Sequence, residues 1–218
     1  MLRTFQLSCV LLLSSLVAFS QAPDQPVVTF TLDFPGSQPE HYSLRVLSDG
    51  AAHYESSGRL SPDSDETDSF DLDFTASPAT RQKVFELAAK AGYFQKDLDA
   101  HHKNLAFTGK KSLSYKDGKR SGESTFNYSS QPAAQQLTDL FQDLSTTLEF
   151  GRRLHYDHRY QKLALDAELK RMEEMARTSP LVELAAIAPI LQQIIGDARV
   201  MNVSRARAQR LLEHAGIR

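Results

Sequence analysis

Residues 28–34 read Val-Thr-Phe-Thr-Leu-Asp-Phe, with apolar and polar side chains in strict alternation. Because successive side chains of a β-strand point to opposite faces, this period of two predicts a strand with one buried face and one face in water. A single strand is not stable alone, so the segment also predicts partner strands and a layer that covers its apolar face.

Further segments with the same alternation supply candidate partner strands. Ser48-Asp49-Gly50 is a turn signal between two of them, and Lys116-Asp117-Gly118 separates two others. The alternating apolar side chains of these segments are Tyr42, Leu44, Val46, Phe70, Leu72, Phe74, Leu113, Tyr115, Phe126 and Tyr128. Short turns of this kind join antiparallel strands, so we expect a sheet built from hairpins.

Helix signals lie between and after the strand segments. Ser77-Pro78 combines an N-cap serine with a proline at the first helical position, and Pro132 opens a second helix with an apolar stripe. Residues 152–177 are rich in strong helix formers and predict one long charged helix. Supporting acid-before-base pairs with the i, i+4 spacing are Glu149/Arg153, Asp166/Lys170 and Glu173/Arg177.

The last forty residues predict two shorter helices. Ser179-Pro180 starts the first of them, Pro189 must kink or split it, and Gly196 ends it. Ser204 is expected to cap the final helix, which Gly216 ends.

The order of these elements is strands, one helix, strands and then helices only. This order predicts an α+β fold, in which an antiparallel sheet built from hairpins packs with helices and an all-helical C-terminal region follows. We expect an α+β domain at residues 24–150 and a helical region at residues 151–218. The sequence leaves open whether the two share one core, because the helix that Pro132 opens is a candidate to run across the boundary.

The first twenty residues predict export. Met1-Leu-Arg carries a positive charge, residues 7–19 are almost entirely apolar, and Ala18-Phe-Ser20 has small residues where a signal peptidase reads. These features are typical of a secretory signal peptide at residues 1–20, with cleavage after Ser20 that leaves Gln21 as the N-terminus. The apolar run is shorter than the roughly 20 residues of a spanning helix, which disfavours a membrane anchor. The expected location is secreted or periplasmic, with no transmembrane segment after cleavage.

Cleavage would also remove Cys9, the only cysteine of the chain. The mature protein is therefore expected to be free of disulfides and to lack a cysteine nucleophile or a zinc–thiolate site. A formal net charge of −2 gives no general attraction to nucleic acid. The basic segment 96–120 holds only Phe107 and Tyr115 for base stacking, so we interpret it as a charged hairpin face and expect no nucleic-acid partner.

His155-Tyr-Asp-His158 is the strongest candidate metal site of the sequence. Two histidines three residues apart share one face of a helix, so both can reach one zinc ion. Neither has a carboxylate four residues away, so His101 or His102 would have to complete the ligand set. The HExxH pattern of zinc hydrolases is missing. A metal-binding protein or metal-assisted hydrolase is thus the alternative interpretation, and no other cofactor is predicted.

The sequence contains no nucleophile elbow, no phosphate-binding loop and no dinucleotide-binding glycine motif. These absences favour a non-enzymatic exported protein that binds or scaffolds another component of the bacterial envelope, with an envelope protein as the candidate partner. The charged helix at 152–177 and the apolar segment 181–195 are candidate contact surfaces, although burial in the core is the simpler interpretation of the second. A small-ligand pocket between sheet and helices is a third hypothesis.

Two C-terminal stretches carry a resemblance. Residues 152–174 begin Arg-Arg-Leu-His-Tyr-Asp-His-Arg-Tyr, and residues 188–205 begin Ala-Pro-Ile-Leu-Gln-Gln-Ile-Ile-Gly. Both resemble uncharacterised exported proteins of soil bacteria, and the N-terminal strands and helix are similar in layout to small exported α+β domains. The resemblance covers most of the mature chain and implies a bacterial envelope setting, without implying an activity.

Overall fold

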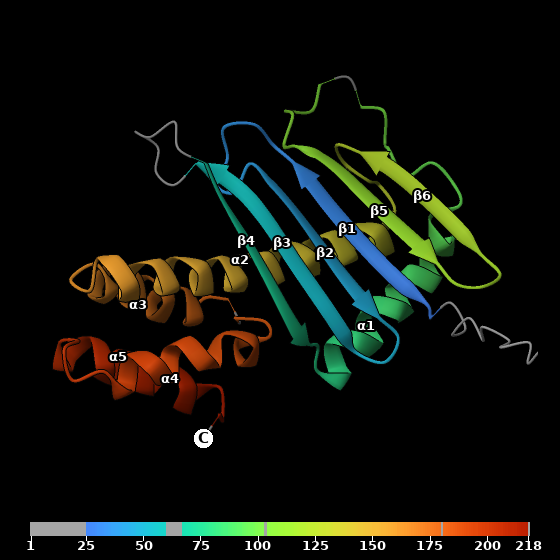
Figure 1. The fold of residues 1–218 in the computed structure, drawn as a ribbon. Coiled ribbons are helices and arrows are strands. Elements are labelled where there is room, and N and C mark those ends of the chain that lie inside the picture. Colours follow the sequence, from blue (N-terminus) through green and yellow to red (C-terminus); the bar gives the residue numbers. More distant parts are fainter. Residues whose placement is uncertain (1–24, 60–66, 103, 180, 218) are drawn as a thin grey trace, which may run out of the picture.

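The computed structural model describes residues 25–59, 67–102, 104–179 and 181–217 and shows an α+β fold. Its strands form one antiparallel sheet in the order β4-β3-β2-β1-β5-β6 (Figure 1). The strands are β1 (Val27–Asp33), β2 (His41–Leu47), β3 (Ala51–Arg59), β4 (Thr67–Thr75), β5 (Lys110–Lys116) and β6 (Ser121–Phe126). The sheet confirms the hairpin-built fold that the alternating segments predict.

Strand β1, which contains most of the segment 28–34, lies in the interior of the sheet and pairs with β2 on one side and β5 on the other. Its Phe30 lies opposite Leu44 and Leu113, so the apolar side chains of three strands meet on one face. A shift of one residue would move this apolar set into water, and the alternation therefore fixes the register.

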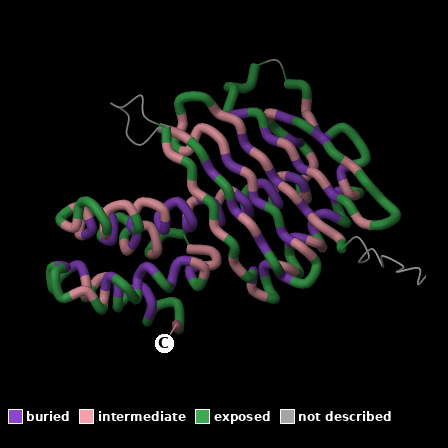
Figure 2. Tube along the Cα trace, viewed as in Figure 1, coloured by how far each residue is buried: buried purple, intermediate pink, exposed green. Residues whose placement is uncertain are grey.

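The helices cover one face of the sheet and then continue beyond it. They are α1 (Pro78–Lys90), η1 (Gly92–Phe94), α2 (Pro132–Tyr160), α3 (Leu165–Ala176), η2 (Leu184–Ile187), α4 (Ala188–Gly196) and α5 (Asn202–His214), where η marks a 3-10 helix. Figure 2 shows buried positions alternating with exposed or half-buried ones along β1, β2 and β5, because α1 and α2 cover only one face of the sheet. Ser77 caps α1 as predicted, since its hydroxyl accepts a hydrogen bond from the Thr80 amide at 3.2 Å. No helix within the described residues is both long enough and apolar enough to cross a membrane.

Helix α2 joins the sheet to the rest of the molecule. Its first half packs on the sheet, where Phe141 stacks on Phe30 with ring centroids 5.4 Å apart. Its second half extends past the sheet and packs with the later helices (Figure 1). We call the last turns of α2 together with α3, η2, α4 and α5 the helical lobe. One hydrophobic cluster contains Phe30 of the sheet and Ile190 of the lobe, and α2 runs unbroken across the boundary expected at residue 151.

The prediction of a single helix at residues 152–177 is wrong. Helix α2 ends at Tyr160, and α3 begins at Leu165. The four residues between them include no glycine or proline, so no local breaker marks the turn. The break buries Leu165, Leu169 and Met172 of α3 in the core. Tertiary packing thus overrides a uniformly high helix propensity.

The helix signals near the C-terminus are confirmed in part. Pro189 splits the predicted helix into η2 and α4, and α4 ends at Gly196. Pro180, which belongs to the helix start predicted at Ser179-Pro180, lies outside the described residues. Ser204 is not the cap of the last helix, because α5 begins at Asn202 and Ser204 is buried inside its first turn.

Gly151 lets α2 approach the rest of the lobe closely. A Cβ atom at this position would lie 2.5 Å from Cγ2 of Ile187, inside the van der Waals separation of two carbons. Gly151→Ala is therefore expected to lower the free energy of unfolding by about 1–3 kcal/mol in chemical denaturation, although alanine stabilises an unobstructed helix. Gly196→Ala is the matched control, because a Cβ there meets nothing within 4 Å. Equal effects of the two substitutions would contradict the close contact.

Candidate functional site

The four histidines of the predicted metal site lie at two separate places. His155 and His158 are on the last turns of α2, whereas His101 and His102 are in the loop between η1 and β5, far from that end of α2 (Figure 1). His158 Nε2 lies 3.2 Å from Asp197 Oδ2. Across the parts of the chain that the structure describes, no three histidine, cysteine, aspartate or glutamate side chains gather in a way that fits a metal ion.

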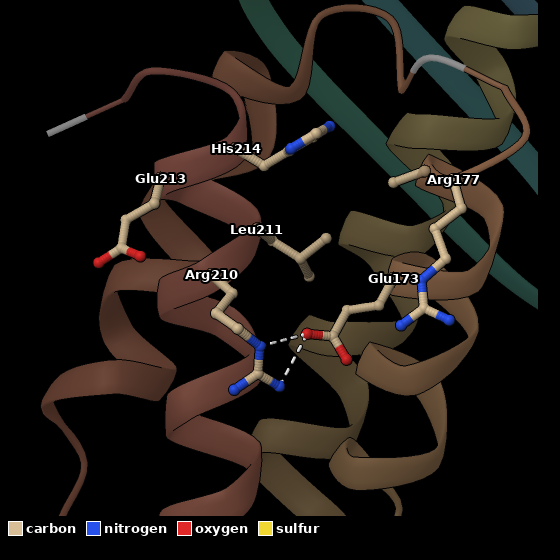
Figure 3. Close-up of a pocket in the computed structure, with 7 residues that line it drawn as sticks. Glu173, Arg177, Arg210, Leu211, Glu213 and His214 are labelled. Atoms are coloured by element: carbon tan, nitrogen blue, oxygen red, sulfur yellow. Dashed lines mark hydrogen bonds and ion pairs between the residues drawn. The ribbon is translucent and has the colours of Figure 1, made fainter.

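A groove in the helical lobe lies between the C-terminal ends of α3 and α5 (Figure 3). Its larger part has a volume of about 530 Å³, and a smaller cavity of about 240 Å³ adjoins it. Ala176, Leu211 and His214 line both parts, which we together call the α3–α5 groove. The remaining lining residues are Glu173, Arg177, Arg210 and Glu213 in the larger part and Leu181, Leu184 and Ala215 in the smaller part.

Ion pairs between α3 and α5 fix the walls of the groove. Arg210 Nε donates to Glu173 Oε1 at 2.8 Å, a contact drawn in Figure 3. Arg207 bonds to Glu173 Oε2 and also donates through Nε to Asp166 Oδ1 at 2.9 Å. Burial opposes the charge of Glu173, but the hydrogen bonds from Arg210 and Arg207 outweigh it and hold the pKa of this carboxyl below its ordinary value. The two helices therefore lie parallel, in a fixed register.

The groove has an apolar floor and a charged rim. Leu184 and Leu211 are buried, and partly buried Leu181 packs against the same core. Figure 3 shows Leu211 directed into the space between the helices, with Arg177, at the end of α3, and His214 of α5 on opposite sides of it. Arg177 follows the last residue of α3, where the helix dipole favours a positive charge. Such a surface suits an apolar anchor that is oriented by charge.

A second cavity, of about 490 Å³, lies between the sheet, α2 and α3. It is where the third sequence hypothesis placed a ligand pocket. Tyr42 of β2, Ser145 and Glu149 of α2, and Arg171 of α3 are among its lining residues. Burial raises the pKa of Tyr42 above its ordinary value, although a hydrogen bond with Ser145 works against this shift. The tyrosine hydroxyl therefore keeps its proton.

Glu149 is a buried carboxylate, only 3% exposed, that lines this cavity. Its Oε1 accepts hydrogen bonds from the Ser56 hydroxyl at 2.6 Å and the Tyr54 hydroxyl at 2.9 Å. Its Oε2 accepts a hydrogen bond from Arg152 Nε at 2.8 Å. Burial, reinforced by the charge of Glu149, raises the pKa of Tyr54, so this hydroxyl remains a donor. Because both oxygens are engaged, Glu149 ties α2 to the sheet and is poorly placed to take a proton from a bound molecule.

Of the three ion pairs predicted within single helices, Glu149/Arg153 is present at the limit of an ion-pair distance, and contacts with other elements dominate at all three acidic side chains. Arg153 Nη1 is 4.0 Å from Glu149 Oε2, and the Arg153 guanidinium bonds instead to Glu168 of α3. Asp166 and Glu173 bond to arginines of α5. An acidic side chain can pair with a base four residues away on its own helix or with a base on another element. The contact with the other element is the stronger one where burial strengthens the electrostatic attraction. One local signal was available for Glu149, because it stands between Leu148 and Phe150 on an otherwise apolar turn.

No protein-family model matches the chain, and no curated protein is significantly similar to it. Its candidate sites are therefore those that the geometry defines, namely the α3–α5 groove and the cavity beside Glu149. The polar groups around Glu149 are engaged in bonds that hold the fold together. The groove, by contrast, offers apolar surface at the outside of the molecule.

Removing the Glu149 carboxylate would leave the half-buried Arg152 without its main partner and the buried hydroxyls of Tyr54 and Ser56 without their acceptor. Glu149→Ala is therefore expected to lower the free energy of unfolding by about 3–5 kcal/mol, measured by urea denaturation. Glu149→Gln should cost less, because its amide oxygen still accepts from Tyr54 and Ser56. Glu55→Ala, on the exposed face of β3, is the control and should change stability by no more than about 0.5 kcal/mol. A loss below about 1 kcal/mol for Glu149→Ala would rule out the anchoring role.

Asp157 of α2 gives the fold a dependence on pH. Burial, with a smaller effect of Glu168, raises the pKa of this carboxyl to about 6, while Arg153 opposes the shift. A raised pKa means that the ionised form costs stability above pH 6, and the cost disappears as pH falls toward the unfolded value of about 4. Asp157→Asn should thus stabilise the protein at pH 7–8 by on the order of 1 kcal/mol after solvent screening, and should have no effect near pH 4. Thermal unfolding followed across this range is the measurement. Asp71→Asn controls for the change in net charge, and a pH-independent gain at Asp157 would contradict the assignment.

Proposed function

We propose that the protein is an exported, non-enzymatic binding protein of the bacterial envelope, which takes a segment of a partner protein in the α3–α5 groove. The observation that carries this proposal is an apolar floor, lined by Leu181, Leu184 and Leu211, that opens at the surface beside a charged rim. Apolar surface in a concavity with a polar border is typical of a recognition site.

The groove favours an amphipathic peptide segment as its occupant. Its walls are two parallel helices held by ion pairs, so little order has to be gained on binding. An apolar side chain of the partner would cover Leu211, and an acidic side chain would face Arg177 at the open end. A helix laid in a groove is recognised through such anchors on one of its faces.

Two further features support the assignment to an exported binding protein. The apolar leader with its small-residue cleavage site at residues 1–20 is typical of a secretory signal, and Cys9 within it is the only cysteine. Glu149, the most deeply buried acidic side chain of the described residues, serves the fold through three hydrogen bonds and leaves no free base at the cavity that it lines. Binding without catalysis fits both features better than a hydrolytic reaction does.

A long charged side chain placed in the groove should abolish partner binding. Ala176 lines both parts of the groove, so Ala176→Arg would fill it and add charge to its apolar floor. We expect the processed wild-type protein to retain an envelope protein from an envelope extract, and Ala176→Arg to lose it at least tenfold by quantitative mass spectrometry. Ala89→Arg, on the exposed side of α1, is the matched control and should retain the partner. Equal recovery with both variants would contradict the groove as the site.

A further inference from the structure

Large apolar side chains are exposed at one end of the helical lobe. Leu163 is 79% exposed and Tyr160 is 63% exposed, both at the junction of α2 and α3. Val203 is 46% exposed and Met201 is 39% exposed, at the start of α5. We call the segments 159–163 and 199–203 together the lobe tip. Apolar side chains that gather on a surface, unlike single scattered ones, mark a contact site.

Polar contacts hold the two segments of the lobe tip side by side. Asp197 Oδ2 lies 2.9 Å from Lys162 Nζ and 3.2 Å from His158 Nε2, which joins the α4–α5 turn to the end of α2. Arg199 Nε donates to the other oxygen, Oδ1, at 2.9 Å. Figure 1 shows the α2–α3 and α4–α5 turns at the same end of the lobe. The exposed apolar side chains therefore belong to a surface held by polar contacts and not to a frayed helix end.

The lobe tip is also rich in positive charge. Arg159, Lys162 and Arg199 belong to it, and Asp197 is the carboxylate that pairs with two of these cations. Two further carboxylates lie nearby. Asp157 is half-buried and interacts with Glu168 and Arg153, and Asp166 on the first turn of α3 pairs with Arg207 of α5. The Arg159 guanidinium lies 5.2 Å from the ring centre of Tyr160. A cation stacked on a tyrosine next to an exposed leucine is typical of residues at a membrane interface, where the ring and the leucine enter the lipid and the cation stays at the headgroups.

From this combination we infer that the lobe tip docks the protein on an anionic lipid bilayer. The apolar side chains stand on two adjacent turns at an extremity of the molecule, and a convex apolar tip suits insertion between headgroups. Charge complementarity selects the occupant, because the surplus cations attract anionic headgroups. A second copy of the chain is a poorer occupant, since a symmetric contact would bring the same cations face to face. This inference does not depend on the α3–α5 groove, which none of these residues line.

The test is co-sedimentation of the protein beginning at Gln21 with vesicles of phosphatidylcholine that contain phosphatidylglycerol or lack it. We expect binding to the anionic vesicles only, weakened by salt. The double variant Tyr160→Ser/Leu163→Ser should reduce the partition coefficient about tenfold, because two inserted side chains are lost. Arg159→Glu should weaken binding to anionic vesicles as well. The matched control is Leu105→Ser/Phe107→Ser, which removes two exposed apolar side chains from the loop before β5 and should bind like wild type.

Three outcomes would overturn the inference. The first is equal binding to vesicles with and without phosphatidylglycerol, and the second is unchanged binding of the tip variant. The third is the absence of vesicle binding together with a protein contact, either self-association or capture of an envelope protein, that the tip variant alone loses. That result would assign the surface to a protein contact. Ala176→Arg should bind vesicles like wild type, so failure of the groove proposal remains distinguishable from failure of this one.

Discussion

The contact on which the whole structure depends is the buried Glu149 carboxylate at the middle of α2. Helix α2 has 29 residues and is about 43 Å long, so the sheet covers only part of it. At the point where the helix leaves the sheet, Glu149 accepts hydrogen bonds from the hydroxyls of Tyr54 and Ser56 in β3 and from the guanidinium of Arg152 in its own helix. Burying a charge is expensive, and these donors offset the cost only in the native arrangement. The network therefore specifies where α2 sits along the sheet, and the chain achieves this with no internal disulfide.

The elements that the sequence predicts correctly are those with a signal inside a few residues. The alternation at 28–34 identifies β1, Ser77 caps α1, and Pro189 splits the helix that contains it. The break between Tyr160 and Leu165 has no such signal, because the residues on both sides and within the turn favour a helix. Its cause is the apolar face of α3, which gains burial only when the chain turns back. A propensity scale cannot register a gain that exists only between distant segments.

The same reason explains why sequence analysis identified the candidate site only in part. The segments 152–177 and 181–195, which are candidate contact surfaces in the sequence, supply one wall and part of the floor of the groove, but no sequence signal pairs them with α5. The groove is formed by residues 173–177 and 210–214, which meet only after the break that ends α2 and the turn that precedes η2. Leu211 is a buried apolar residue, and its residue type alone does not show that it also lines a surface groove. The i, i+4 spacing predicts an ion pair between Glu173 and Arg177, although Glu173 bonds to Arg207 and Arg210. Sequence spacing describes neighbours on one helix, whereas the proposed binding groove lies between two helices.

The parallel arrangement of α3 and α5 separates the two proposed contact surfaces. Both helices begin at the lobe tip, and both end at the α3–α5 groove. Since α3 spans Leu165–Ala176, its length places about 15–20 Å between them. A bilayer that accepts Leu163 at one end would therefore leave Leu211 and Arg177 free at the other. The ion pairs of Arg207 and Arg210 that set this register also keep the two surfaces at a constant separation, so a partner held in the groove would lie at a defined height above the lipid.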